Sequence, residues 1–264
     1  LPLLEHLNEA LDAARRLAER YKEQGRFQEA EPLAAKSVAL NREVYGDSHS
    51  HTVSALTDMG IILGMLGRHQ EAEPYHKEAY ESSASNLGED HPDTLDKLNN
   101  LAVHHWYLGD YQRSLQLFAQ NLESVRRRLG EDHPDTAYAM TNLAIVHTKP
   151  GRLDESETLL KKAMSIREKA FGIDHRHTLE TRASLASLAN AKGDVEESKQ
   201  LYTALVEAQK RVLGVDHPLT LESGYNLALV TEAVGQLEEA AALMEAAWER
   251  RKAVVGETHS ETLD

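Results

Sequence analysis

The sequence contains no cysteine, which excludes a disulfide framework and any metal site built from thiolates. The same absence suits a reducing compartment, and we therefore expect a cytoplasmic protein. Positive charge is scarce, because 29 Lys and Arg stand against 43 Asp and Glu and give a net charge of -14. A surface of this sign repels a phosphate backbone, so no nucleic acid is expected as a partner.

Long apolar runs and catalytic motifs are also absent from the sequence. No apolar run approaches the ~20 residues that a membrane-spanning helix needs, and residues 1–24 carry charges throughout, unlike a signal peptide. There is no phosphate-binding loop, no nucleophile elbow and no HExxH motif. We therefore expect no membrane association, no enzymatic activity and no cofactor.

What the chain does contain is an internal repeat with a period of 42 residues. The segment LGEDHPDT at residues 87–94 returns unchanged at residues 129–136. Weaker copies keep the same spacing and begin at Tyr45, Phe171, Leu213 and Val255. Glycines mark the period twice, at Gly46, Gly88, Gly130, Gly172, Gly214 and Gly256 and, half a period away, at Gly25, Gly67, Gly109, Gly151, Gly193 and Gly235. A fixed period of this length is typical of an array in which each unit packs on its neighbours.

Each period has the pattern of two amphipathic helices. In the third repeat, Leu95, Leu98 and Leu101 recur every three residues, which places them on one face of a helix. A glycine ends this helix, and a second helix follows until the next glycine. The pattern predicts first helices over residues 3–24, 50–66, 92–108, 134–150, 176–192 and 218–234, and second helices over residues 26–45, 68–87, 110–129, 152–171, 194–213 and 236–255.

Small residues recur where the two helices of a repeat must approach closely. Five residues after each mid-repeat glycine stand Ala30, Ala72, Ser114, Ser156, Ser198 and Ala240, and seven residues before it stand Ala18, Gly60, Ala102, Ala144, Ala186 and Ala228. No strand pattern interrupts the series. We therefore expect one all-α array over residues 1–264, with repeats at 3–45, 50–87, 92–129, 134–171, 176–213 and 218–255.

The segment at residues 256–264 begins a seventh repeat and then stops, so we expect the natural chain to continue. The outer face of the last second helix would then lack its neighbour at Leu243, Met244, Ala247 and Trp248. An uncapped repeat end is normally covered, so we expect this face to pack on another chain or on the remaining residues.

The helical hairpins, the small residues at the crossing and the mid-hairpin glycine resemble the tetratricopeptide repeat. The longer period and the LGxDHPxT signature resemble the kinesin light chain type, which also occurs in nephrocystin-like proteins and NLR-like signalling ATPases. The resemblance implies a right-handed superhelical solenoid of six helix-turn-helix repeats that acts as a scaffold for protein–protein interaction. Its specificity must come from the surface, because repeats of this type occur in unrelated parent proteins.

The same resemblance implies that the first helices line a peptide-binding groove. At the sixth position after the signature threonine stand Asn100, Asn142 and Asn226, whereas Asp58, Ser184 and Arg16 depart from the pattern. In related repeats an asparagine here holds the backbone of an extended peptide, since one amide supplies both a donor and an acceptor. The candidate peptide-binding residues are Asp58, Asn99, Asn100, Val103, Trp106, Tyr107, Tyr138, Thr141, Asn142, Ile145, Tyr225 and Asn226.

Two alternatives apply to these residues. The asparagines could bond neighbouring helices or face water, and Trp106 or Tyr107 could pack as core between first helices. Tyrosine and tryptophan are nevertheless the usual anchors of interfaces, because they combine apolar area with a polar tip.

Charge separates this groove from those of the best-known relatives. The groove positions of repeats two to six carry one basic residue, Lys149, and five acidic ones, Asp58, Asp96, Glu180, Glu222 and Glu232. Kinesin light chain grooves favour acidic cargo, whereas this sequence predicts a neutral-apolar or basic peptide segment. The carboxylate clamp of chaperone-binding relatives is absent as well, because the basic residues Arg15, Arg16 and Lys22 are confined to the first repeat.

The sequence has 14 histidines, and six of them belong to the repeated signature, at His49, His91, His133, His175, His217 and His259. A spacing of 42 residues spreads them along the array, so we expect helix capping or loop packing from them. His104, His105 and His147 could cluster, but no carboxylate stands in helical register with them. We therefore expect no metal site.

A second hypothesis for the function is assembly. The array could be the oligomerising, autoinhibitory or sensor segment of a larger protein, such as an NLR-like signalling ATPase. Self-association through exposed repeat ends would favour this hypothesis over capture of a free peptide. A histidine-based metal enzyme is a third alternative, and it would require metal in the purified protein.

Overall fold

A computed structural model describes residues 16–22, 24–149 and 151–255, apart from the side chains of residues 251 and 253–255. All the regular secondary structure in these residues is α-helical, which confirms the predicted all-α class. The start of the first predicted helix, His259 and the beginning of the seventh repeat lie outside the described residues.

The chain divides into two compact units, residues 1–128 and 129–264. In unit 1 residues 16–22 are helical. They are followed by α2 (Phe27–Tyr45), α3 (Ser50–Met65), α4 (His69–Leu87), α5 (Pro92–Tyr107) and α6 (Tyr111–Leu129). Unit 2 contains α7 (Pro134–His147), α8 (Leu153–Phe171), α9 (Arg176–Lys192), α10 (Val195–Val212), α11 (Pro218–Ala233) and α12 (Leu237–Val255).

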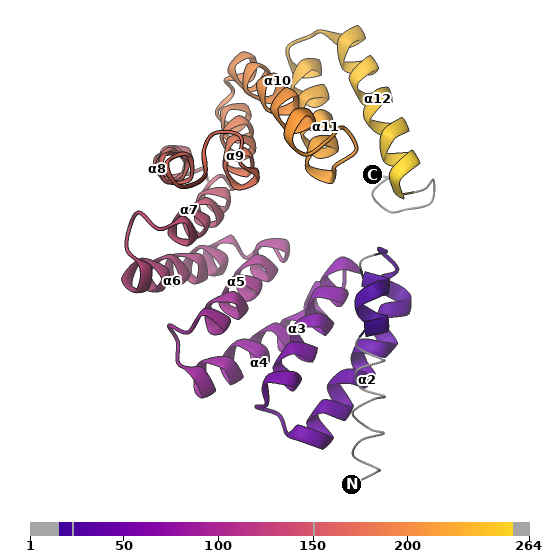
Figure 1. The fold of residues 1–264 in the computed structure, drawn as a ribbon, viewed down its shortest axis with the longest axis vertical. Helices are drawn as coiled ribbons and strands as arrows, with labels where there is room; N and C mark the ends of the chain where they lie inside the picture. The colour runs from indigo at the N-terminus through magenta and orange to yellow at the C-terminus, as the bar shows by residue number, and fades with distance from the viewer. Residues whose placement is uncertain (1–15, 23, 150, 256–264) are drawn as a thin grey trace. The chain divides into compact units, whose positions relative to one another are not determined.

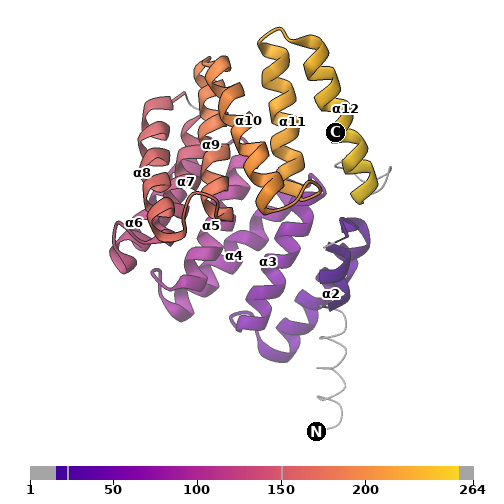
Figure 2. The ribbon, with the colours of Figure 1, turned by 45° about the horizontal axis from the view of Figure 1, so that its top comes forward.

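Within each unit, consecutive helices lie side by side as antiparallel hairpins (Figures 1 and 2). The second helix of one hairpin also packs on the first helix of the next, as α4 does on α5 and α8 on α9. None of the described helices combines the length and the apolar character that crossing a bilayer requires.

From α2 onward, the observed helix ends agree with the predicted ones to within one residue, except at the end of α7. This helix ends at His147 instead of residue 150. Pro150 has no N–H to donate, and a proline disfavours helical conformation in the residue before it. The N–H groups of Thr148 and Lys149 instead bond to carbonyls only three residues back, at 3.3 Å each.

The small residues at the crossing of each hairpin are buried as predicted. In three hairpins the serine hydroxyl donates to the carbonyl of the small residue on the first helix, at 2.8 Å each, in the pairs Ser114–Ala102, Ser156–Ala144 and Ser198–Ala186. All six residues have exposed fractions of 0%. The hydrogen bond satisfies a hydroxyl that would otherwise be costly to bury at such a close approach.

The signature histidines cap the first helices, which confirms the capping prediction. The Nδ1 atoms of His49, His91, His133, His175 and His217 accept the backbone N–H two residues further on, at 3.1–3.3 Å. Each cap satisfies one of the N–H groups that a helix start leaves without a partner.

The signature threonine fixes the loop before each cap. In four repeats its hydroxyl donates to the signature glycine carbonyl at 2.7–2.9 Å, in the pairs Thr52–Gly46, Thr136–Gly130, Thr178–Gly172 and Thr220–Gly214. Gly172 has a φ of 88°, in the left-handed region that residues with a Cβ rarely adopt. Glycine, histidine and threonine at intervals of three residues therefore form one loop clamp, defined by Gly172, His175 and Thr178 and their equivalents.

Unit 1 contains a histidine cluster that the repeat pattern does not predict. His76 of α4 and His104 of α5 are buried, and their ring centroids are 5.2 Å apart. The His76 ring also lies against Gly60 of α3, where an added Cβ would be 2.7–2.9 Å from it. Burial, and next the neighbouring His104, lower the pKa of His76 to about 4. Burial is also the main cause that lowers the pKa of His104.

Replacing Thr178 by valine should lower the free energy of unfolding by about 1 to 2 kcal/mol, because the Gly172 carbonyl loses the shorter of its two hydrogen bonds, at a side chain that is 0% exposed, and keeps only the one from the His175 N–H at 3.4 Å. The matched control is Thr203→Val, since this exposed hydroxyl donates to Lys199 within α10 at 2.8 Å. Urea unfolding of both variants measures the difference. Equal losses would contradict the loop clamp.

Replacing Gly60 by alanine should destabilise the protein by about 1 to 3 kcal/mol, since the new methyl group collides with the buried His76 ring. Gly224→Ala is the control, because nothing lies within 4 Å of its added Cβ and alanine favours a helix by up to ~1 kcal/mol. The double variant Gly60→Ala/His76→Ala should recover part of the loss in thermal unfolding. No recovery would rule out the Gly60–His76 contact as the cause.

Stability should fall on acidification because His76 is held neutral. Its folded pKa of about 4 lies below the unfolded value, so its contribution is complete above ~6.5 and is lost as the pH falls towards 4. At about pH 5 the loss should be about 2 kcal/mol. Urea unfolding across this range should show the full effect in the native chain and in His51→Gln, an exposed control, and a smaller one in His76→Gln, where the buried His104 remains. Parallel profiles for all three would contradict it.

Candidate functional site

The predicted peptide-binding residues lie on the first helices of the hairpins in both units. Unit 1 carries Asp58 on α3 and Asn99, Asn100, Val103, Trp106 and Tyr107 on α5. Unit 2 carries Tyr138, Thr141, Asn142 and Ile145 on α7 and Tyr225 and Asn226 on α11. The structure brings residues together within each unit, and the two sets are described separately.

In unit 1 the two aromatic candidates form a small surface cluster. Tyr107 is 60% exposed and stacks on His69 of α4, with ring centroids 5.4 Å apart. Trp106 is half-buried and meets Tyr107 edge-on at 4.9 Å. Tyr107 is therefore not the core residue that one alternative predicts. Asn99, Asn100 and Val103 are half-buried on the same helix.

Asp58 is balanced by a positive charge. Its carboxylate accepts a hydrogen bond from Lys22 at 3.0 Å, and Glu19 also pairs with this lysine at 3.0 Å. Burial lowers the pKa of Lys22, but the two carboxylates more than offset this and raise it. The sequence could not show this pair, because 36 residues separate the two partners.

In unit 2 the first helices present an apolar and amide-bearing surface. Tyr138, Ile145, Tyr225 and Leu229 have exposed fractions of 50%, 42%, 37% and 39%. Asn142 and Asn226 are half-buried beside them, and Ser184 of α9 occupies the equivalent position between them in the repeat order. We call this surface the A face of unit 2, with the residues Tyr138, Asn142, Ile145, Ser184, Tyr225, Asn226 and Leu229.

Thr141 differs from the other candidates because it is buried. Its exposed fraction is 6%, and its hydroxyl donates to the Ala137 carbonyl of the same helix at 2.9 Å. Asn99 and Tyr225 stand at the equivalent position in their repeats, and both are more exposed. Repeat position alone therefore does not fix the exposure of a side chain.

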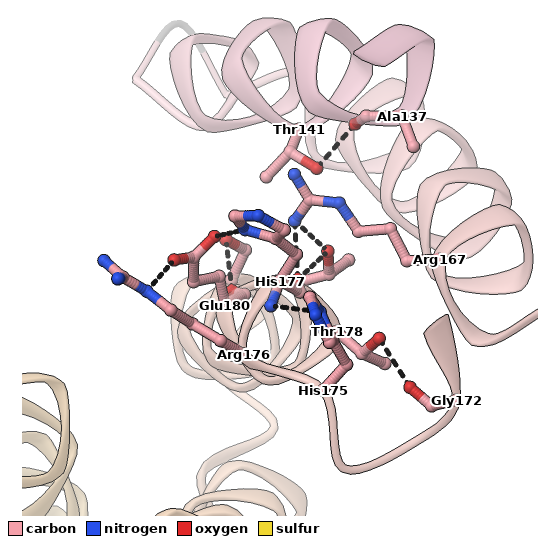
Figure 3. Close-up of polar contacts among 11 residues, drawn as sticks. Ala137, Thr141, Arg167, Gly172, His175, Arg176, His177, Thr178 and Glu180 are labelled. Atoms are coloured by element: carbon pink, nitrogen blue, oxygen red, sulfur yellow. Dashed lines mark hydrogen bonds and ion pairs between the residues drawn. The ribbon is translucent and has the colours of Figure 1, made fainter. Parts of the chain in front are cut away.

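The acidic side chains of this face are partly engaged. Glu180 of α9 accepts a hydrogen bond from Arg176 at 3.2 Å and lies 3.1 Å from Nδ1 of His177 (Figure 3). Glu222 and Glu232 of α11 are exposed. Because Lys22 pairs with Asp58 and Arg176 pairs with Glu180, the net negative charge at these two groove positions is smaller than the sequence suggests.

One residue near this face was not predicted at all. Arg167 of α8 is only 2% exposed, and Figure 3 shows its guanidinium between Thr141 on α7 and the start of α9. Its Nη1 donates to the His177 carbonyl and the Thr181 hydroxyl, at 2.7 Å each. Its Nε is buried without a hydrogen-bond partner. Burial lowers the pKa of this arginine, and the charge of Glu180 opposes that shift.

Arg167 occupies a repeat position that is uncharged in four other repeats and carries Arg251 in the last one. The uncharged equivalents are Asn41, Ser83, Val125 and Gln209, and all of them are buried. In unit 1 the small Ser83 leaves an open pocket there, lined also by Ser54 of α3 and by Asp93 and Lys97 of α5. The change from an uncharged residue in the first three repeats to an arginine at 167 was the sequence signal that could have identified Arg167.

No metal centre is present in the part of the chain that the structure describes. There, no group of three or more histidines or carboxylates is placed so that it could hold a metal ion. His104 and His105 belong to the packed cluster of unit 1, with ring centroids 5.8 Å apart.

No curated protein sequence shows significant similarity to the chain. Among solved structures, a putative kinesin light chain from Podospora anserina with nearly identical TPR-like repeats is 24% identical, with a TM-score of 0.66 over 76% of this chain and 95% of that one. BtubC from P. vanneervenii is 17% identical, with a TM-score of 0.61 over 95% and 92%. NprR in complex with its cognate peptide NprX is 16% identical, with a TM-score of 0.69 over 97% and 70%.

The match to a protein family is more specific than these structural similarities. The tetratricopeptide repeat family matches residues 9–85, 93–169 and 178–253, which together are well over half of the chain. The matched segments agree with the hairpins, the loop clamps and the resemblance to kinesin light chain repeats. The chain therefore belongs to the tetratricopeptide repeat family, whose members typically serve as scaffolds for protein–protein interaction.

Proposed function

We propose that the A face of unit 2 binds an extended segment of a protein partner, and that the body of this segment is neutral and apolar, or basic. The observation that carries the proposal is the exposure of Tyr138, Ile145, Tyr225 and Leu229, at 37–50%, on the first helices α7 and α11, which precede and follow α9 in the repeat order. Apolar side chains that gather on one face are typical of an interaction surface. Tyrosines add a polar tip that can bond to a partner.

The asparagines supply the second part of the proposed recognition. Asn142 and Asn226 stand at the same repeat position on α7 and α11. An amide can donate to a peptide carbonyl and accept from a peptide N–H, so it can hold a backbone whatever the side chain is. Ser184 of α9 provides a shorter polar group between them, and its hydroxyl already donates to the Glu180 carbonyl at 3.2 Å.

The charge of the segment follows from the exposed acidic residues. Glu222 and Glu232 are exposed on α11, whereas the charge of Glu180 is partly met by Arg176. A segment rich in acidic residues would be repelled by this surface, and a neutral or basic one would not. The absence of cysteine supports a partner in the cytoplasm.

Two further observations support a peptide ligand. NprR, whose fold is similar to this chain, was solved in complex with its cognate peptide NprX. Unit 1 also exposes Tyr107 beside the half-buried Asn100, so we propose the same kind of role for Asn99, Asn100, Val103, Trp106 and Tyr107 and, through its repeat position, for Asp58.

Assembly is the second candidate function, and the last helix favours it. Leu237 and Trp248 of α12 are 65% and 46% exposed. Exposed apolar side chains of this size on one helix suit packing against another chain. Self-association through α12 would then accompany, or replace, peptide capture.

The experiment that tests the peptide hypothesis is a selection from a displayed peptide library against the 264-residue chain. We expect enriched sequences that are neutral-apolar or basic. The double substitution Asn142→Ala/Asn226→Ala should lower the affinity of the chain for these peptides about 10-fold or more, since each amide holds up to two backbone hydrogen bonds. Asn190→Ala is the control, because this exposed asparagine of α9 lies outside the repeat position.

Each of two results would contradict the proposal. Enrichment of acidic peptides over matched basic ones would refute the charge argument. Equal enrichment of peptides by the native chain and by Asn142→Ala/Asn226→Ala would show that the binding surface lies outside the A face. A chain that selects no peptide but forms dimers, and becomes monomeric on Trp248→Glu, would favour assembly.

A further inference from the structure

Unit 2 buries one positive charge without a counter-charge. The guanidinium of Arg167 is 2% exposed and makes no ion pair with any carboxylate among the described residues. Its two protein acceptors are neutral, and both bond to Nη1. A buried cation in such surroundings is costly unless a partner compensates it, so the arrangement requires a reason.

The free edge of the guanidinium is well suited to an anion. With Nη1 held by the His177 carbonyl and the Thr181 hydroxyl, the edge formed by Nε and Nη2 has no protein acceptor. This is an edge through which arginine binds a carboxylate with two parallel hydrogen bonds. The two existing bonds fix the plane of the group, which lowers the entropy cost of binding.

The guanidinium lies next to the A face of unit 2. In Figure 3 it lies between Thr141 of α7 and the start of α9. Glu180 of α9 is near enough for its charge to act on the guanidinium. In unit 1 the equivalent Ser83 lines an open pocket between α3 and α5. Arg167 therefore occupies the inter-repeat pocket that Ser83 leaves empty.

The obvious internal partner is already engaged. Glu180 points to Arg176 and His177, at 3.2 and 3.1 Å, and does not pair with Arg167 (Figure 3). The exposed side chains of Arg176 and His177 thus engage the Glu180 carboxylate, which does not pair with the buried guanidinium of Arg167. This arrangement leaves Arg167 available to an incoming anion.

A second orphan group occurs at the same position one repeat later. Gln209 of α10 is 1% exposed, and its Oε1 is buried without a hydrogen-bond partner. A buried acceptor of this kind suits a backbone N–H of a ligand. The two orphan groups differ in chemistry, because Arg167 can only donate at this edge and Oε1 of Gln209 can only accept.

We propose that Arg167 binds one carboxylate of the segment that lies along the A face of unit 2. The inference rests on the proposed function and specifies its ligand: a neutral-apolar or basic body with a single carboxylate between α7 and α9. The carboxylate is either the free C-terminus of the segment or an aspartate or glutamate side chain. Gln209 would accept a backbone N–H of the same segment one repeat further on.

The direct test needs no peptide. Sodium acetate and its neutral analogue acetamide are titrated into the 264-residue chain while the Arg167 side-chain Nε resonance is followed by NMR. We expect a saturable shift with acetate and none with acetamide. Equal shifts with both, or no shift with acetate, would overturn the proposal.

Matched variants identify the residue responsible. Arg167→Met should abolish the acetate effect on the amide resonances of α9, and Arg167→Lys should keep part of it, because one charge remains without the fork. Lys169→Met is the control, since it removes an exposed charge from the same end of α8. Glu180→Gln should strengthen acetate binding by removing a nearby negative charge. Acetate binding that is unchanged in Arg167→Met would overturn the proposal, provided circular dichroism shows native helix content.

Selected peptides then distinguish the source of the carboxylate. If the free C-terminus supplies the carboxylate, amidation of the peptide should weaken its binding to the native chain about 10- to 100-fold. If a side chain supplies it, replacement of each Asp by Asn and each Glu by Gln should have this effect instead. Neither change should affect binding to Arg167→Met. Peptides that depend on Asn142 and Asn226 but ignore Arg167 would overturn this inference and leave the proposed function intact. Acetate binding at Arg167 without any peptide enrichment would contradict the proposed function and, with it, the assignment of the carboxylate to a peptide segment.

Discussion

The loop clamp between hairpins is the constraint on which the rest of the structure depends. In each clamp a glycine turns the chain and a histidine ring caps the next helix, and in four of them a threonine hydroxyl also donates to the glycine carbonyl, as in Gly172, His175 and Thr178. Because the clamp fixes where one helix ends and the next begins, every residue can be assigned to a position that recurs after 42 residues. Equivalent side chains then meet equivalent neighbours, and a departure from the pattern becomes informative.

Elements that depend on local chemistry could be predicted from the sequence. Helix ends followed from glycines, the caps from the signature histidines, and the hairpin crossings from pairs such as Ser156 and Ala144. Side chains whose partners lie on another helix could not be predicted, because periodicity carries no information on them. Asp58 is balanced by Lys22 from 36 residues away, and Thr141 is buried like its equivalent Thr57, whereas the equivalent Tyr225 is exposed.

Histidine has two separate uses in this chain. At the signature position the ring acts through one nitrogen, which accepts a backbone N–H at the surface of the loop. In unit 1, by contrast, His76 fills the space that Gly60 leaves and meets His104 in the interior. The first use recurs because the loop recurs, whereas the second depends on one missing side chain. An unusual residue in one repeat therefore indicates a compensating change in its neighbour.

The same argument applies to Arg167, but there the compensation is incomplete. The glycine at position 60 is matched by a ring that fits it, whereas the arginine gains only a carbonyl and a hydroxyl, and its Nε stays unpaired. A regular array can tolerate one such residue, because its stability is a sum over many repeats and interfaces. Other buried side-chain atoms also lack a hydrogen-bond partner, such as Nδ1 of His76, but Arg167 in addition carries a charge that no described carboxylate pairs with, so a ligand has more to gain there. The repeat therefore acts as an internal control, against which an uncompensated side chain indicates a binding position.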